Sequence, residues 1–141
     1  MTKQNKTATI PFDKALEEVE KWLDHKRVPQ RSRDAQEEVV NQIAEAISDG
    51  YLILNDDHSF THTLLIPLDD GEGKVTVEEL TYIPRLNSIQ LEAGMKGLSP
   101  SNPTDIVNGH IIALTGKPKG IIRKLDTMDI KLSRSIVTFF L

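Results

Sequence analysis

Histidines and aspartates are the residues of this sequence that could bind a metal or transfer protons. His58 and His62 are four positions apart, and Asp56 and Asp57 stand beside them. On a helix, this spacing would place two imidazoles on one metal ion. The flanking residues indicate a turn followed by a strand, where the two rings share a side but lie farther apart. We therefore interpret them as solvated turn residues and a strand-face histidine, and not as metal ligands.

A second concentration of polar residues is the segment 69–73, with the sequence DDGEG. It lacks the ligand register of a calcium loop and matches neither glycine-rich phosphate-binding pattern, whereas its residue types are typical of a turn. No serine stands in a G-x-S-x-G elbow, and His110 adjoins the apolar face of a predicted helix. The sequence thus indicates a protein that is not an enzyme and that needs no metal or cofactor.

Strand-forming residues flank this turn. β-branched and aromatic side chains on both sides of it predict a β-hairpin, and a short apolar run before the hairpin adds a third strand. The phase of the apolar positions slips within the last strand, and a bulge near Glu78 and Glu79 would restore Leu80 and Tyr82 to the core. The prediction is an antiparallel meander with strands at 51–55, 60–67 and 75–83.

Helical periodicity appears on both sides of the meander. Residues 11–50 predict a helical hairpin whose second helix is capped by Ser32, and residues 86–141 predict several C-terminal helices. One of these has a weak stripe of Leu86, Ile89 and Ala93, another begins at Asn102-Pro103 and stops at Gly116, and the last buries Met128, Leu132, Ile136 and Phe139. We expect one α+β domain over residues 1–141. In it, the N-terminal helical hairpin and the C-terminal helices pack against a short three-stranded antiparallel meander.

The bulk composition narrows the class of protein. Apolar residues make up 38% of the chain, cysteine is absent, and no run approaches the roughly 18 apolar residues of a membrane span. The first residues contain lysines but no apolar stretch typical of a secretory signal. We therefore expect a cytoplasmic protein with no membrane partner.

The charge is distributed unevenly along the chain. Residues 34–92 carry thirteen acidic and two basic side chains, whereas the segments before and after them are net basic. A winged-helix DNA-binding protein has a similar order of elements, but the recognition helix would be 33–49, whose acidic side chains would repel phosphates. We therefore expect no nucleic acid partner. The charge pattern fits either attraction between the acidic and basic segments of the chain or the selection of a protein partner by charge.

The chain ends on an apolar segment, Ile136–Leu141. If this segment is helical, its apolar side chains lie on more than one face of the helix. The segment is therefore either the last helix of the core or a tail that binds a partner. We expect Leu132, Ile136 and Phe139 to face the sheet. We expect the partner-binding surface, for a client or for self-association, to consist of Val137, Phe140 and Leu141 beside Lys131 and Arg134.

Several segments together resemble the tail assembly chaperones of Mu-like contractile-tailed phages and prophages. They are the apolar strand Leu64–Pro67 with the following Asp70-Gly71, then Val77–Arg85, Ile112–Gly116 and Leu125–Asp129. Ile83 stands where the family usually has arginine, and residues 11–50 lie outside the resemblance.

The resemblance implies a small cytoplasmic protein without enzymatic activity that binds the tape measure protein while the tail tube polymerises. A tape measure protein presents long amphipathic helices, and a chaperone would shield their apolar stripes reversibly. The alternative is a small adaptor or regulatory module with another protein client.

Overall fold

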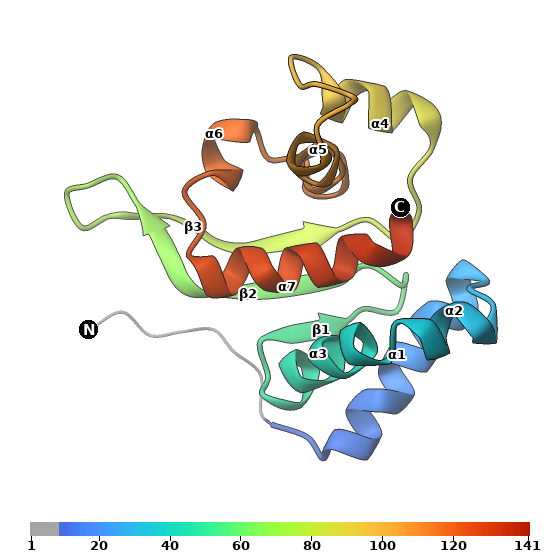
Figure 1. Ribbon diagram of the computed structural model, residues 1–141. Coiled ribbons are helices and arrows are strands. Elements are labelled where there is room, and N and C mark those ends of the chain that lie inside the picture. The colour runs from blue at the N-terminus through green and yellow to red at the C-terminus, as the bar shows by residue number, and fades with distance from the viewer. Residues whose placement is uncertain (1–8) are drawn as a thin grey trace.

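The computed structural model describes residues 9–141, so the segment on which the expectation about a secretory signal rests lies mostly outside it. Within this range the chain is a mixed helical and β structure (Figure 1). Its elements in chain order are α1 (Phe12–Lys26), α2 (Gln30–Ala35), α3 (Glu37–Ser48), β1 (Leu52–Leu54), β2 (Phe60–Asp69), β3 (Val75–Tyr82), α4 (Ser88–Met95), α5 (Pro103–Thr115), α6 (Lys119–Ile122), α7 (Thr127–Val137) and the 3₁₀ helix η1 (Thr138–Phe140).

The three strands form one antiparallel sheet in the order β1-β2-β3, so the predicted α+β fold with a meander is confirmed. One face of the sheet carries buried side chains that alternate along β2 and β3 as a period of two requires. They are Phe60, His62, Leu64, Leu80 and Tyr82. Helix α7 runs along β2 on this side, with α3 next to β1 and α5 next to β3 (Figure 1).

The hairpin has two register shifts. In the second, between Leu68 and Asp69, the extra residue is Thr76 of β3. In the first, opposite Glu78, where the bulge was predicted on β3, the extra residues are instead on β2. Thr63 pairs with Glu79 and Leu68 pairs with Val77, so the four residues Leu64–Pro67 face a single residue of β3. Pro67 has no amide hydrogen and cannot donate a hydrogen bond to the neighbouring strand, so this stretch does not pair regularly with β3. This stretch includes Leu65 and Ile66, whose amides donate hydrogen bonds to a side chain of α7.

The N-terminal hairpin is formed by α1 and α3, with the additional helix α2 between them. The predicted second helix is broken at Gln36, and Ser32 lies inside α2 instead of capping it, because α2 begins directly after Pro29. Arg33 explains the position of α2. Its guanidinium lies 2.6 Å from a Glu20 oxygen and 2.8 Å from an Asp24 oxygen, so these ion pairs hold α2 against α1.

Trp22 joins the three parts of the chain in one core. Its buried ring lies 4.8 Å from the ring of Phe60 on β2, 5.8 Å from Phe139 and 6.0 Å from Phe140, measured between centroids. Aromatic pairs at these separations add to the burial of apolar area. The N-terminal hairpin, the sheet and the C-terminal segment thus share one hydrophobic cluster.

Helix α5 begins and ends where the sequence predicts. The Asn102 side chain accepts hydrogen bonds from the amides of Thr104 and Asp105, Pro103 occupies the first turn, and Gly116 takes a left-handed conformation with φ 69°. Both the capping at the start of α5 and the glycine stop at its end depend only on residues next to the helix ends.

The predicted stripe of α4 is wrong at two of its three positions, whereas Leu86 packs against the core but lies before the helix begins. Ile89 is 77% exposed and Ala93 is also exposed, because α4 contacts α5 through a different face. The contact is made by Gly94, which lies against Gly109 and Ala113 without room for a side chain.

Candidate functional site

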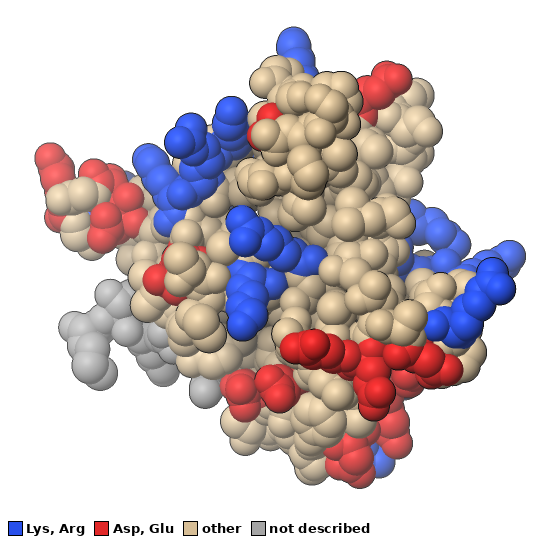
Figure 2. Space-filling view, viewed as in Figure 1, with Lys and Arg blue, Asp and Glu red and all other residues tan. Residues whose placement is uncertain are grey.

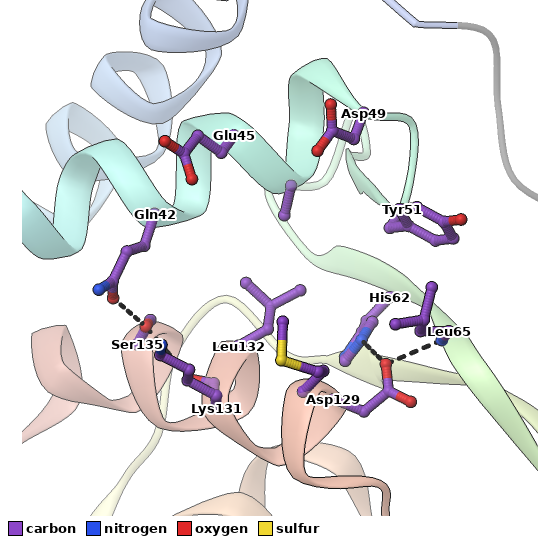
Figure 3. A pocket seen from close by; sticks show the side chains of 12 residues that line it. Gln42, Glu45, Asp49, Tyr51, His62, Leu65, Asp129, Lys131, Leu132 and Ser135 are labelled. Carbon is purple, nitrogen blue, oxygen red and sulfur yellow. Dashed lines mark hydrogen bonds and ion pairs between the residues drawn. The ribbon is translucent and has the colours of Figure 1, made fainter.

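A groove lies between α3 and α7 and extends to β2 (Figure 3). Its volume is about 360 Å³, which is in the range of sites that hold a small ligand or one or two large side chains. It is lined by Gln42, Glu45, Ala46, Asp49, Tyr51, His62, Leu65, Met128, Asp129, Lys131, Leu132 and Ser135. A hydrogen bond of 2.8 Å from the Ser135 hydroxyl to the Gln42 side-chain oxygen ties α7 to α3 at one end, and Tyr51 stands at the other.

A buried polar network connects the sheet with α7 at one side of this groove. The Nε2 atom of His62 lies 3.2 Å from a carboxylate oxygen of Asp129, and its Nδ1 lies 2.9 Å from the Tyr82 hydroxyl. The Tyr82 hydroxyl lies 2.5 Å from the hydroxyl of Ser133. A carboxylate can only accept, so Nε2 carries a proton; in a neutral ring Nδ1 then accepts from Tyr82, which accepts from Ser133. Burial raises the pKa of Tyr82, which keeps it a neutral hydroxyl.

Asp129 is also the acceptor for the irregular part of β2. Its carboxylate accepts hydrogen bonds from the amide of Leu65 at 2.8 Å and from the amide of Ile66 at 3.1 Å. Burial by itself raises the pKa of this carboxyl group, but the hydrogen bonds from His62 and from the two amides outweigh it and lower the pKa. One carboxylate in the first turn of α7 therefore accepts hydrogen bonds from two consecutive amides of the irregular part of β2.

This network stabilises the structure and offers no free base to the groove. Both ring nitrogens of His62 are occupied, and His62 and Ser133 are almost completely buried. A general base has to reach the proton that it removes, and its acceptor atom has to be free. The network instead fixes the position of α7 on the sheet, and α7 is one wall of the groove.

Acid is expected to remove the stabilisation that the Asp129 carboxylate provides. Its folded-state pKa lies below the ordinary 3.8, so the contribution is complete above about pH 4 and is lost as the pH falls through the folded-state pKa. Urea unfolding at about pH 5 and about pH 3 measures this loss. The variant Asp129→Asn should lose less stability over the same interval than the original protein, and equal losses would show that other carboxylates are responsible.

The two walls of the groove carry opposite charges. Glu45 stands on α3, Asp49 is the residue that caps the end of α3, and Lys131 stands on α7. In Figure 2 acidic side chains gather over the part of the surface formed by α1 and α3, and basic side chains lie over α7 and extend toward α6. Between these walls Met128, Leu132 and Leu65 provide apolar surface, and Met128 is 59% exposed.

The structure separates the residues predicted to bind a partner. Lys131 lines the groove and Arg134 is exposed on the same helix. Val137 is completely buried, so its predicted exposure is wrong. Phe140 is partly covered by Trp22 and by Lys26, whose Nζ lies 3.3 Å from the ring centroid, and Leu141 is 67% exposed. The binding role of these residues stays a prediction.

The last helix also departs from the predicted packing at its start. Met128 was expected in the core and instead stands at the groove, whereas Ile136 is completely buried as expected. On the opposite wall stand Gln42, Glu45 and Asp49, which were not among the predicted site residues. Their spacing of three and four places them on one side of α3, beside its apolar face, and this pattern could have indicated a polar wall.

The two histidines considered as metal ligands do not lie together in the structure. His58 stacks on His25 of α1 with the ring centroids 3.9 Å apart, whereas His62 is part of the buried network. Among residues 9–141, no group of three or more histidine, aspartate or glutamate side chains could hold a metal ion. Within the same range, no helix is long and apolar enough to cross a lipid bilayer.

Comparison with known proteins gives no match: no family model, curated protein or solved structure is similar to this chain.

Proposed function

We propose that this protein is a non-enzymatic cytoplasmic chaperone that binds an amphipathic helix of a client protein in the groove between α3 and α7. The client implied by the motif resemblance is the tape measure protein of a contractile phage tail. The observation that carries the proposal is the groove itself, which combines an apolar surface with one acidic and one basic wall.

This groove suits a helix that has apolar side chains on one face and charged side chains beside them. An apolar side chain of the client would cover Met128 and Leu132, a basic one would pair with Glu45 or Asp49, and an acidic one with Lys131. Apolar contact provides most of the affinity in such helix-in-groove complexes. The charged walls select the orientation and the partner more than they add affinity.

The positions of the family-like segments support the phage assignment. Leu64–Pro67 is the irregular stretch of β2, and Leu125–Asp129 leads into α7. These two segments are about 60 residues apart in sequence but are joined by the hydrogen bonds from Leu65 and Ile66 to Asp129. Two of the segments that carry the resemblance thus meet at the edge of the groove.

A small adaptor with another protein client is the second candidate, because the groove alone does not define whose helix it binds. The two candidates differ in one measurable respect. A chaperone keeps an isolated tape measure protein in solution and leaves it when the tube forms, whereas an adaptor has no effect on that protein.

Co-expression with the tape measure protein of the same genome tests the proposal. We expect the tape measure protein to remain soluble with the original chain and to aggregate with the variant Met128→Glu. Burying an apolar side chain contributes about 1.5–3 kcal/mol, so this change should weaken binding about tenfold or more. Because Met128 is exposed, the variant should fold normally.

The matched control is Ile89→Glu, which also replaces an exposed apolar side chain but lies on α4, outside the groove. It should leave the tape measure protein soluble. Equal effects of the two variants, or no effect of the original chain, would contradict the proposal.

A further inference from the structure

A second pocket, of about 230 Å³, lies where the end of α1 meets the segment between β3 and α4. It shares no lining residue with the groove between α3 and α7. It is lined by Lys26, Arg85, Leu86, Asn87, Ser88, Leu91, His110, Phe139 and Phe140. Three of these side chains are basic, and no acidic side chain is among them.

Lys26 has no carboxylate partner among the described residues. Its Nζ lies 3.3 Å from the centroid of the Phe140 ring and 5.7 Å from that of Trp22. Burial, and after it the charge of Arg85, lower the pKa of Lys26 to about 8. The ammonium group of Lys26 thus lies near a second cation, Arg85. Two like charges repel each other unless an anion binds between them.

Toward the residues that the structure describes, Arg85 and His110 likewise leave hydrogen-bonding capacity unused. The guanidinium of Arg85 makes one long contact of 3.4 Å with the carbonyl oxygen of His25. His110 is only 6% exposed, and its Nδ1 lies 2.7 Å from the carbonyl oxygen of Ile106. A carbonyl oxygen only accepts, so Nδ1 donates this bond and Nε2 is left for a ligand.

We propose that this pocket binds an oxyanion, either a carboxylate or a phosphate group. The ammonium group of Lys26 and the guanidinium of Arg85 provide charge-assisted donors, and the imidazole of His110 provides a third donor when protonated. Asn87 and Ser88 stand at the amino end of α4, where the helix dipole adds partial positive charge. The proposal does not depend on the chaperone function, because the pocket lies apart from the groove.

The pH dependence of this site follows from the groups around it. An anion favours the charged form of Lys26, so affinity should fall as the pH rises through about 8. His25 on α1 and His58 in the β1–β2 turn stack beside this region, and Arg85 and Lys26 both act on His25. Burial and the neighbouring positive charges lower the pKa of His25, so its imidazole is mostly neutral over the range in which Lys26 loses its proton.

Titration of the full chain with inorganic phosphate, at constant ionic strength in chloride, tests the proposal. The single tryptophan, Trp22, is a built-in reporter because its ring lies beside both Lys26 and Phe140. We expect a saturable change in its fluorescence with a Kd on the order of 1 mM, weakening between about pH 7 and about pH 9. A second titration with a short capped peptide containing one glutamate compares a protein carboxylate with free phosphate as the source of the anion.

Two variants and a matched control complete the experiment. Lys26→Met keeps the apolar stem and removes the charge, Arg85→Gln removes the second cation, and each should weaken binding about tenfold. Lys21→Met on the same helix, where the lysine is exposed and paired with Glu18, should leave binding unchanged. Tighter binding of either phosphate or the glutamate peptide supports the proposal and identifies the source. Failure of both to saturate, or equal weakening by Lys21→Met, would overturn it.

Discussion

Replacing Asp129 with asparagine is expected to lower the free energy of unfolding by about 3 kcal/mol. The carboxylate accepts hydrogen bonds from His62 and from the amides of Leu65 and Ile66, and its side chain is 3% exposed. An asparagine has the same shape but presents one NH₂ group, so that one of these donors would face another donor. Urea denaturation of both proteins measures the difference.

The control is Asp126→Asn on the same helix. Asp126 caps α7 by accepting a hydrogen bond from the amide of Met128, and asparagine caps a helix about as well as aspartate. This variant should be nearly as stable as the original protein. If the two variants lose similar amounts of stability, general loss of negative charge explains the effect and the buried network does not.

Replacing Gly94 with alanine is expected to destabilise the protein by about 2 kcal/mol, although alanine favours helices by about 1 kcal/mol over glycine. A Cβ at this position would collide with the carbonyl oxygen of Gly109 and would lie 2.8 Å from the Cβ of Ala113. Both obstacles belong to the body of α5, so α4 would have to move as a whole. The midpoint of urea unfolding measures the change.

Gly120→Ala on α6 is the matched control, because a Cβ there meets nothing within 4 Å. This change should leave stability unchanged or raise it by up to about 1 kcal/mol. A stabilising effect of Gly94→Ala would contradict the close approach of α4 to α5.

Features that depend on neighbouring residues could be predicted from the sequence. The alternation of side chains located the strands, and Asn102, Pro103 and Gly116 defined both ends of α5, because these signals act within a few residues. The bulge opposite Glu78 was placed on β3 instead of β2, because the sequence shows that the phase slips but not which strand holds the extra residues at that point.

Features that depend on distant residues could not be predicted. Nothing local distinguishes Asp129, which serves β2, from Asp126, which caps its own helix. Val137 was expected to be exposed because a periodicity argument assumes one buried face. Helix α7 contacts the sheet, α3 and α5, so that Ile136 and Val137 are both buried. The groove is formed by segments that meet only in the fold, so the sequence could indicate the polar side of one helix but not that it faces α7 across a groove.

The most direct test of the client-binding groove is backbone amide NMR of the protein during titration with a helical peptide from the tape measure protein. We predict that the amide resonances that shift most belong to α3 and α7, with Glu45, Lys131 and Leu132 among them. Shifts confined to other elements, or no shifts at peptide concentrations of about 1 mM, would contradict the account.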